Sequence, residues 1–563
     1  MSSMPLAVLP NSSGDETSDD TAFAIDSENK ELEASVLEPA EVHLEGHEKD
    51  IEQGSETPVE RDFADRNPFK HVITAQDWSG PEDPENPHNW SLLKRSYHTV
   101  PPALFGFTVF ASVSQPMAAA NNRQALLIHF ADTRTVASSI YTPAVPEIMK
   151  RFGVSQTAAL LGLSLYVLGL GFGPALAAPI SETYGRSIVY KTSLPMFMLF
   201  TLGAGYSQNF ASLLVCRLFA GLTGAPVLAV GAGTNADLFP PHLRAVSTSL
   251  FLLAPFAGPA LGPVIGGFAA QHKGWQWTMW CTLFIAVAAY LVSLGTHETY
   301  KKVILQRRAK RFGIPPPPYN GPEGFGRVKF LVTVTLFRPV HMLFAEPIVG
   351  FLSLYTAFTF AVVFAFFAAF PLVFGGVYGF DTSQTGLTFL AIGTGICIAV
   401  PTAILLDRAL YQPVHRQKMT QGLSIVAPEH RLYSAMVGSV GIPIGLFWFA
   451  WTARPGVHWA VPVVAAVPFA WGNLCVFISA ALYLVDTYGP LNGASAMAAN
   501  GIARYTLGAA FPLFTVQMYH RLGIAWATSL LGFISLAMLP IPWVLHKWGP
   551  EIRRKSAYET IKA

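Results

Sequence analysis

The chain has 563 residues, of which 13% are charged and 51% hydrophobic, and its mean hydropathy is +0.38. A soluble protein needs roughly one-quarter charged residues to wet its surface, so this composition excludes a soluble enzyme and predicts a chain that lies largely in lipid. The net charge of +2 combines an acidic first 60 residues, with 16 Asp and Glu against two Lys, with a basic remainder, and we expect no nucleic-acid partner.

Residues 1–92 form the first predicted segment, an acidic cytosolic tail that is too polar to bury a core and is expected to be disordered. Its last part carries Pro81, Pro84 and Pro87 at three-residue spacing, which favours an extended strip near the membrane surface. The four cysteines stand apart in apolar runs with no ligand cluster, so we expect no disulfide framework, no metal site and no cofactor.

The rest of the chain contains repeated apolar runs of the length that a bilayer demands, which is roughly 20 residues for a core of about 30 Å. Nine of these runs contain no charge. Two more stretches are each predicted to form a helix with a single charge, 218–236 after Arg217 and 487–519 around Arg504. With a first span near 98–142, the sequence predicts an all-α membrane protein of twelve transmembrane helices. The uninterrupted runs are 157–181, 192–216, 245–271, 274–296, 347–380, 382–406, 432–453, 459–485 and 522–545.

These spans fall into two sets of six, an N-terminal bundle at 93–297 and a C-terminal bundle at 342–546. The loop between them, 298–341, carries nine Lys and Arg, whereas the loops near 207–210 and 374–383 carry none. The positive-inside rule therefore places this loop in the cytosol, together with both termini and the basic tail 547–563. We expect a multi-pass protein of the cell membrane, with the vacuolar membrane as the alternative.

The first span contains an anomaly at 114–135, where polar and charged residues interrupt an apolar run. Removing these 22 residues joins the flanking pieces into one helix of suitable length. Two interpretations stay open, a translated intron and a genuine insertion that loops out of the membrane.

Short passages along the chain carry a family resemblance. Ala178-x-x-x-Glu182 leads into Gly185-Arg186 after the second span, and Ala403-x-x-x-Asp407 leads into Arg408 after the eighth, as in transporters built from repeats. The chain resembles the fungal twelve-span drug:proton antiporters of the major facilitator superfamily over residues 77–555. The other passages are Asp77-Trp78 to Asn89-Trp90, Arg217-x-x-x-Gly221, Gly258-x-x-x-Gly262-Pro263-x-x-Gly266-Gly267, Glu298-Thr299-Tyr300, Glu346-Pro347, Pro428-Glu429-x-Arg431-Leu432 and Ser495-Ala496 to Phe511-Pro512-Leu513-Phe514.

Charged residues inside or beside the spans are the first candidate site. An unpaired Arg217 in hydrocarbon costs several kcal/mol, so it is either a fixed charge that tunes a carboxylate or a structural group bonded to helix carbonyls. Glu182 and Arg186 lie four apart, which allows an ion pair within the helix or contacts with a neighbouring helix. The resemblance implies that this pair latches one transport state, while the plainer alternative is an interfacial anchor.

Proton coupling is implied by the resemblance, and it needs a carboxylate. The acidic residues of the membrane body lie near helix ends, with none clearly in the middle of a span. Glu346 and Asp486 are the best candidates for carrying the proton, and Asp237 and Arg504 complete the predicted coupling and gating group.

The fifth span has glycines on one helical face at Gly258, Gly262, Gly266 and Gly267, with Pro263 adding a local bend. Such a face lets another backbone approach closely. It is a packing seam in either interpretation, and in antiporters it also joins the halves and closes the cavity.

A drug-sized ligand needs an aromatic and polar cavity, for which the seventh and tenth spans offer Tyr355, Phe358, Asn473 and Phe477. The leading hypothesis is a monomeric, proton-coupled exporter of small molecules that works by alternating access. The alternatives are a proton-coupled nutrient importer and a membrane sensor that transports nothing. The sequence has no metal-spaced His cluster, no G-x-S-x-G elbow and no phosphate-binding Walker loop, so we do not expect an enzyme.

Overall fold

The computed structural model describes residues 77–80, 83–91, 94–95, 97–98, 133–239, 244–316, 333–421 and 426–560. Within these ranges the chain is helical and we find no strand. Of the predicted first span, 98–142, residues 99–132 fall outside the described residues, and so does the anomalous segment 114–135 up to residue 132. The described part of this span from residue 133 begins with α4 (Thr133–Ser139).

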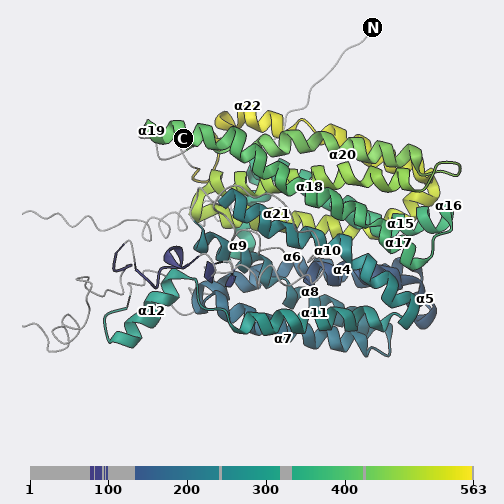
Figure 1. Cartoon of the computed structure of the whole chain (residues 1–563), viewed down its shortest axis with the longest axis horizontal. Coiled ribbons are helices and arrows are strands. Elements are labelled where there is room, and N and C mark those ends of the chain that lie inside the picture. Colours follow the sequence, from purple (N-terminus) through teal and green to yellow (C-terminus); the bar gives the residue numbers. More distant parts are fainter. Residues whose placement is uncertain are drawn as a thin grey trace, which may run out of the picture.

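The helices of the first half run roughly parallel to one long axis (Figure 1). The Ser155 side chain caps α6 by accepting a hydrogen bond from the Ala158 backbone N–H. The Asn209 side chain caps α8 by accepting one from the Ser212 backbone N–H. After α4, the elements of this half are α5 (Val145–Phe152), α6 (Gln156–Tyr184), α7 (Arg186–Gly205), α8 (Phe210–Gly224), α9 (Pro226–Leu238), α10 (Arg244–Lys273) and α11 (Gln276–Leu294).

The second half repeats this arrangement (Figure 1). Between the halves lie α12 (Lys301–Phe312), η5 (Thr333–Phe337) and α14 (Arg338–Ala345). The elements of the second half are α15 (Pro347–Phe370), η6 (Pro371–Gly375), α16 (Gly376–Tyr378), α17 (Thr382–Thr388), α18 (Leu390–Leu406), η7 (Asp407–Tyr411), α19 (Gln412–Thr420), η8 (Pro428–Leu432), α20 (Tyr433–Thr452), α21 (Ala460–Met538) and α22 (Ile541–Arg554).

The element α21 contains two breaks and turns back on itself at each. Its backbone is non-helical at Gly489 and at Gly523, which divide it into helices at 460–488, 490–522 and 524–538. These breaks agree with the predicted spans 459–485, 487–519 and 522–545. Eight helical segments of the described chain are long and apolar enough to cross a membrane.

One predicted boundary is wrong. The apolar run 192–216 was taken as a single span, but it crosses a turn, because α7 ends at Gly205 and α8 begins at Phe210. The fourth membrane span consists of α8 followed by α9. Arg217 therefore lies inside this span and not at the boundary between the third and fourth spans. Ser207, Gln208 and the capping residue Asn209 mark this turn in the sequence.

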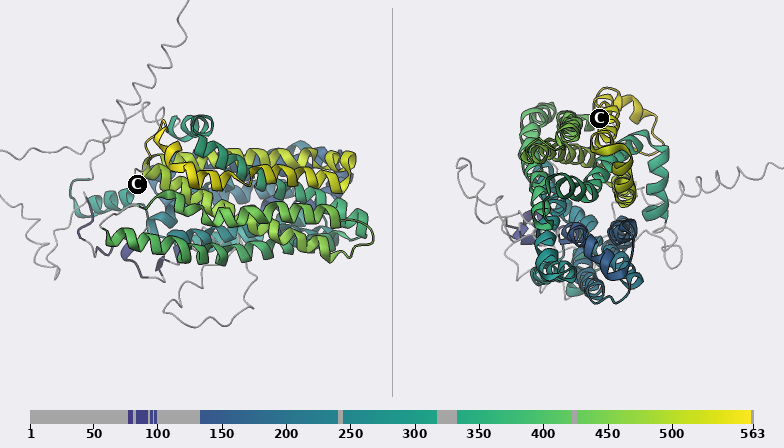
Figure 2. Two further views of the ribbon diagram at one scale, coloured as in Figure 1. Left: turned by 90° about the horizontal axis from the view of Figure 1, so that it is seen from above. Right: turned by 90° about the vertical axis from the view of Figure 1, so that its right-hand side faces the viewer.

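The two halves form separate groups of helices when the molecule is viewed along its long axis (Figure 2, right). They meet where α10 packs against α17 and α18, and where α21 packs against α6. A single cluster of buried hydrophobic side chains continues through both halves. Large apolar side chains such as Phe284 and Leu291 are exposed on the outside, which is the surface expected of a protein in contact with lipid.

Candidate functional site

A charge cluster joins three helices of the first half, at the end of the molecule where α12 lies. The Arg186 side chain, at the first residue of α7, donates from Nε to Oδ2 of Asp237 at 3.3 Å and from Nη1 to Ser181 Oγ at 2.6 Å. Its backbone N–H donates to Oε1 of Glu298 at 2.8 Å. Arg186 therefore ties the ends of α6 and α9 to the segment that follows α11.

The predicted pairing within one helix, between Glu182 and Arg186, is not what the structure has. Gly185 separates α6 from α7 with φ at 104°, a conformation that other residues rarely adopt, so the four-residue spacing does not continue across it. Glu182 is exposed, and Arg186 takes its partners from neighbouring helices, which was the second alternative. A Cβ at Gly185 would collide with the Glu298 carboxylate.

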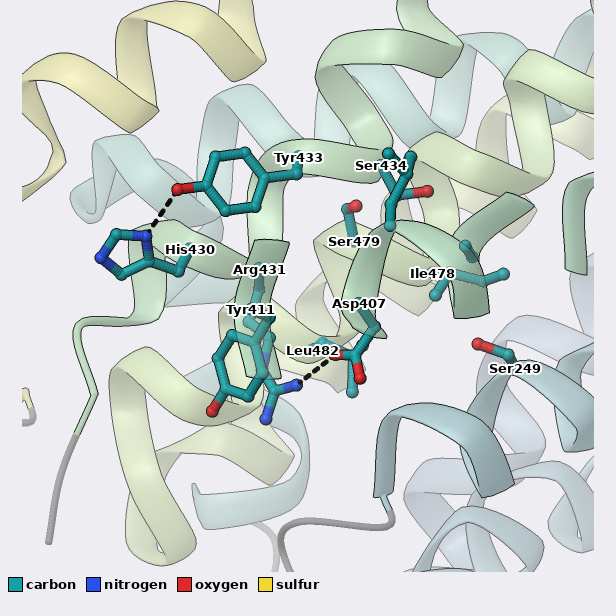
Figure 3. Close-up of a pocket in the computed structure, with 12 residues that line it drawn as sticks. Ser249, Asp407, Tyr411, His430, Arg431, Tyr433, Ser434, Ile478, Ser479 and Leu482 are labelled. Carbon is teal, nitrogen blue, oxygen red and sulfur yellow. Dashed lines mark hydrogen bonds and ion pairs between the residues drawn. The ribbon is translucent and has the colours of Figure 1, made fainter. Parts of the chain in front are cut away.

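The second half contains a cluster of the same design around Arg431 (Figure 3). Arg431 donates from Nε to Asp486 Oδ2 at 2.7 Å and from Nη1 to Asp407 Oδ1 at 3.2 Å. Its guanidinium lies 3.7 Å from the centre of the Tyr411 ring. Arg431, Asp407 and Tyr411 line a pocket that is completed by Ser249 of α10, a residue of the other half.

The two clusters occupy equivalent places in the two halves. Arg186 begins the helix after the second span and bonds Asp237 at the end of the fourth, whereas Arg431 precedes the ninth span and bonds Asp486 near the end of the tenth. The weak internal repeat in the sequence matches these networks only in part, because Arg186 and Asp407 belong to them, while their ion pairs use Asp237, Arg431 and Asp486 in place of Glu182 and Arg408. The predicted proton carrier Asp486 is a partner of Arg431, and the Asp486 side chain is 28% exposed.

The other predicted proton carrier, Glu346, is 2% exposed and has three donors. Tyr488 Oη donates to Oε2 at 2.7 Å, Ser556 Oγ donates to the same atom at 2.8 Å, and the Ala557 backbone N–H donates to Oε1 at 2.8 Å. Glu346 therefore joins the start of α15 to the middle of α21 and to the C-terminal segment.

Arg217 is 2% exposed on α8. Its Nε donates to the Gly162 carbonyl oxygen at 3.1 Å and its Nη1 to that of Ala137 at 3.0 Å. The guanidinium also lies 4.2 Å from the Tyr166 ring centre and 4.9 Å from that of Tyr141. These contacts match the alternative in which Arg217 is bonded to helix carbonyls.

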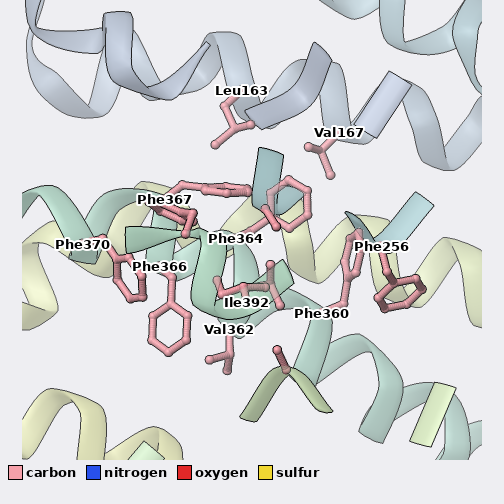
Figure 4. Packing of buried hydrophobic residues seen from close by; sticks show 14 of the residues in the cluster. Leu163, Val167, Phe256, Phe360, Val362, Phe364, Phe366, Phe367, Phe370 and Ile392 are labelled. Carbon is pink, nitrogen blue, oxygen red and sulfur yellow. The ribbon is translucent and has the colours of Figure 1, made fainter. Parts of the chain in front are cut away.

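The predicted cavity residues are all buried. The ring centre of Phe477 lies 4.5 Å from Cζ of Arg504. Phe358 packs against the ring of Phe511 on α21. Tyr355 is fully buried, and its hydroxyl has no hydrogen-bond partner among the described residues. Asn473 is also buried. The centre of the molecule is filled by phenylalanines of α15, which face Leu163 and Val167 of α6 (Figure 4).

The glycine face of α10 contacts both halves. A Cβ at Gly262 or Gly266 would collide with Ser139 or Ile140 of the first span, and Gly258 accepts a hydrogen bond on its carbonyl from Ser139 Oγ at 3.2 Å. On the other side, a Cβ at Gly267 would lie 2.9 Å from the Thr382 carbonyl oxygen of α17, while the Pro263 carbonyl oxygen fills the place of a Cβ at Gly386.

Polar side chains also join the halves at the end where α5 and α17 lie. Gln271 Oε1 accepts from the Ser383 backbone N–H at 2.9 Å and from its hydroxyl at 2.6 Å. Gln517 and Thr157 are hydrogen-bonded at 2.7 Å between α21 and α6. These contacts involve neutral groups.

Sequence reasoning missed a buried ion pair that fixes the segment ahead of the membrane. Arg308 on α12 donates to both carboxylate oxygens of Asp83 at 2.8 Å and to Glu85 at 2.6 Å. Burial acts to raise the pKa of Asp83, but hydrogen bonds from Arg308 and from the backbone N–H groups of Ser79 and Glu85 outweigh it and lower this pKa from 3.8. The acidic and basic residues were visible in the sequence, but their separation of 225 residues was not bridged by any pattern.

A second missed ion pair joins α22 to η8 in the second half. Arg553 on α22 donates from Nε to Oε1 of Glu429 at 2.8 Å and from Nη2 to Oε2 at 3.1 Å, and both side chains are buried. Glu429 stood in a passage that carried the family resemblance, which was the available signal. No group of three or more metal-ligating side chains occurs within the described ranges.

A membrane-spanning helical protein built from two similar halves, with matching charge clusters at one end, has the architecture of a transporter. The family model of the Major Facilitator Superfamily matches residues 133–512, and the chain belongs to that superfamily. It is a secondary transporter and a multi-pass membrane protein.

Named proteins with similar sequences are fungal transporters. The chain is 39% identical over 506 residues to Polyamine transporter 4 of Saccharomyces cerevisiae, covering 86% of this chain and 73% of the relative. It is 38% identical over 430 residues to Efflux pump FUBT of Fusarium oxysporum, covering 75% and 72%. Among solved structures, the human organic anion transporter MFSD10 (TETRAN) superposes with a TM-score of 0.55 at 14% identity, over 80% of this chain and 100% of that one.

Proposed function

We propose that this protein exports small molecules from the cytosol in exchange for protons, as a monomer in the cell membrane. The bundles 93–297 and 342–546 would rock about a central site, so that each side of the membrane gains access in turn. The observation that carries the proposal is the pair of Arg-centred clusters, around Arg186 and Arg431, at the same end of both halves. The export direction is supported by the printed name of Efflux pump FUBT.

The clusters would hold together the helix ends that surround the cytosolic entrance, each within its own half. The basic helix α12, with Lys301, Arg307 and Arg308, lies at the same end, and positive charge of this kind stays on the cytosolic side. Both termini would then be cytosolic. Tags at each end, tested for labelling in intact and permeabilised cells, measure this orientation, and labelling of either tag in intact cells would contradict it.

Asp486 is the most suitable proton carrier in this scheme. Its carboxylate is partly exposed and can exchange protons with water, whereas Glu346 is sealed by the C-terminal segment. Protonation of Asp486 would remove one of the two negative partners of Arg431 and so weaken the contacts that hold these helix ends together within the second half.

The experiment is flux into inside-out vesicles from cells that express the chain, with an imposed pH gradient and a panel of fluorescent small molecules. We expect uptake that stops when an ionophore collapses the gradient, and slower uptake with Asp486→Asn. Uptake that continues without the gradient would contradict proton coupling, and uptake of every probe at the rate of empty vesicles would contradict transport of this class of compound.

A further inference from the structure

Arg504 lies in the middle of the helix 490–522, in a cage of three aromatic rings. It is 6% exposed, and its Cζ lies 4.9 Å from the ring centre of Phe360, 4.5 Å from that of Phe477 and 4.6 Å from that of Tyr505. The Nε atom has no hydrogen-bond partner among the described residues. A guanidinium normally uses this donor together with Nη to hold a carboxylate with two parallel hydrogen bonds.

The charge around this cage is unbalanced. Across the described membrane helices, the carboxylates lie at helix ends, as Asp237, Glu346, Asp407 and Asp486 do. The other buried central cation of these helices, Arg217, has Nε and Nη1 held by backbone carbonyls, and only its Nη2 has no partner among the described residues. Cation–π contacts are individually weak compared with the cost of burying an uncompensated charge, so an anion would complete this site.

The cage lies at the contact between the two bundles, where a transported molecule would pass. The Tyr505 Cβ lies 3.0 Å from where a Cβ on Gly171 of α6 would be, and the Phe477 ring centre lies 4.9 Å from that of Phe256 on α10. Phe256 and Phe360 are seen together beside the central aromatic core in Figure 4. Rocking of the halves would therefore expose one side of the cage.

A neutral polar group lies one helical turn before Arg504. The Asn500 amide nitrogen donates to Thr356 Oγ1 at 2.6 Å, while its buried Oδ1 has no partner among the described residues. This oxygen can accept a hydrogen bond from a hydroxyl or N–H on the ligand. The aromatic walls suit a flat, apolar body.

We propose that Arg504 and Asn500 form the anchor of a substrate site for aromatic carboxylates. This inference rests on the proposed function, because it specifies the molecule that the central site takes. The carboxylate would bind Nε and Nη of Arg504, the ring would stack among Phe360, Phe477 and Tyr505, and polycations would be repelled. An exporter of organic acids differs in substrate charge from a polyamine exporter.

Binding to the purified full-length chain in detergent is the direct test. The probes are 2-naphthoate, its methyl ester and spermidine, measured by isothermal titration. We expect naphthoate to bind at least tenfold more tightly than the ester, and spermidine not to compete with it. Equal binding of acid and ester, or displacement of naphthoate by spermidine, would overturn the proposal.

Variants connect the preference to this residue. We expect Arg504→Gln to abolish the preference for acid over ester and Arg504→Lys to keep part of it, because Lys retains the charge without the two-pronged geometry. Arg454→Gln, the same change at an exposed position, should leave the preference intact. Unchanged acid preference in a well-folded Arg504→Gln would refute the role of Arg504. If this variant does not fold, the comparison of acid with ester on the unaltered chain decides.

The two proposals can fail separately. Vesicles that transport spermidine or the ester with a pH gradient, and ignore naphthoate, would retain proton-coupled export and reject the carboxylate site. Naphthoate binding that depends on Arg504, without any gradient-driven flux of naphthoate, would retain the site and reject the export function.

Discussion

Gly386 on α17 offers the sharpest test of the seam between the halves. Its place for a Cβ is filled by the Pro263 carbonyl oxygen of α10, with the Pro263 carbonyl carbon at 3.1 Å and Val264 Cα at 3.4 Å. All three atoms belong to backbone, which cannot move aside as a side-chain end would. The substitution Gly386→Ala therefore overpacks the contact, at a cost of about 1–3 kcal/mol.

This cost falls only on arrangements in which α10 and α17 touch. A difference of 1–3 kcal/mol between two conformations changes their ratio by about 5- to 150-fold, so we expect Gly386→Ala to alter the transport rate per folded molecule. The assay is flux in reconstituted liposomes, normalised to the amount of monodisperse protein, with the melting temperature measured in parallel.

Two alanine substitutions serve as matched controls. In Gly266→Ala the new methyl group meets the Ile140 carbonyl oxygen inside the first half, so we expect lower stability and unchanged flux per folded molecule. In Gly501→Ala it meets nothing within 4 Å, so we expect no loss of either. The reasoning is refuted if Gly386→Ala and Gly501→Ala have the same flux and the same melting temperature.

Further predictions concern the buried charged side chains. Arg431→Gln should lower the melting temperature, because it leaves two carboxylates without their cation, and neutralising both carboxylates to amides in the same variant should restore part of the loss; no recovery would contradict the ion-pair account. Arg308→Gln should release the segment 77–91 for proteolysis at neutral pH. In the unaltered chain, the pKa of Asp83 is lowered, so the stability that its ion pair gives to this segment is fully present above the usual pKa of 3.8. This stability is lost as the pH falls through the lower pKa of the folded protein. Proteolytic cleavage of the segment should therefore rise in that pH window, and cleavage that does not rise would count against the pair. Glu346→Ala should expose the C-terminal segment after residue 554 to trypsin, while unchanged protection would show that other contacts hold it.

The helices could be predicted from sequence because membrane spans are long and apolar. The error at 192–216 arose because the turn at 206–209 is short and is flanked by apolar residues on both sides. Hydropathy averaged over a span length does not resolve such a turn, whereas the capping residue Asn209 does. The double reversal of α21 was predictable, since the boundaries between the predicted spans 459–485, 487–519 and 522–545 lie within a few residues of the breaks at Gly489 and Gly523.

The candidate site was only partly predictable. The sequence singled out three members of the charge clusters, Arg186, Asp237 and Asp486, but it did not single out Arg431, and it could not pair residues that lie far apart in the chain. Arg186 and Asp237 are separated by 51 residues. The local rule for residues four apart favoured Glu182 instead, and it failed because Gly185 interrupts the helix between them.

The ion pairs around Arg186 and Arg431 each lie within one half. A rigid rotation of the halves would consequently break neutral hydrogen bonds, such as that between Gln517 and Thr157, and would leave the ion pairs intact. Separating opposite charges in a medium of low dielectric constant is expensive, so such self-contained bundles can exchange between orientations across a low electrostatic barrier. The energy for directional movement can then come from the ligand and the proton alone.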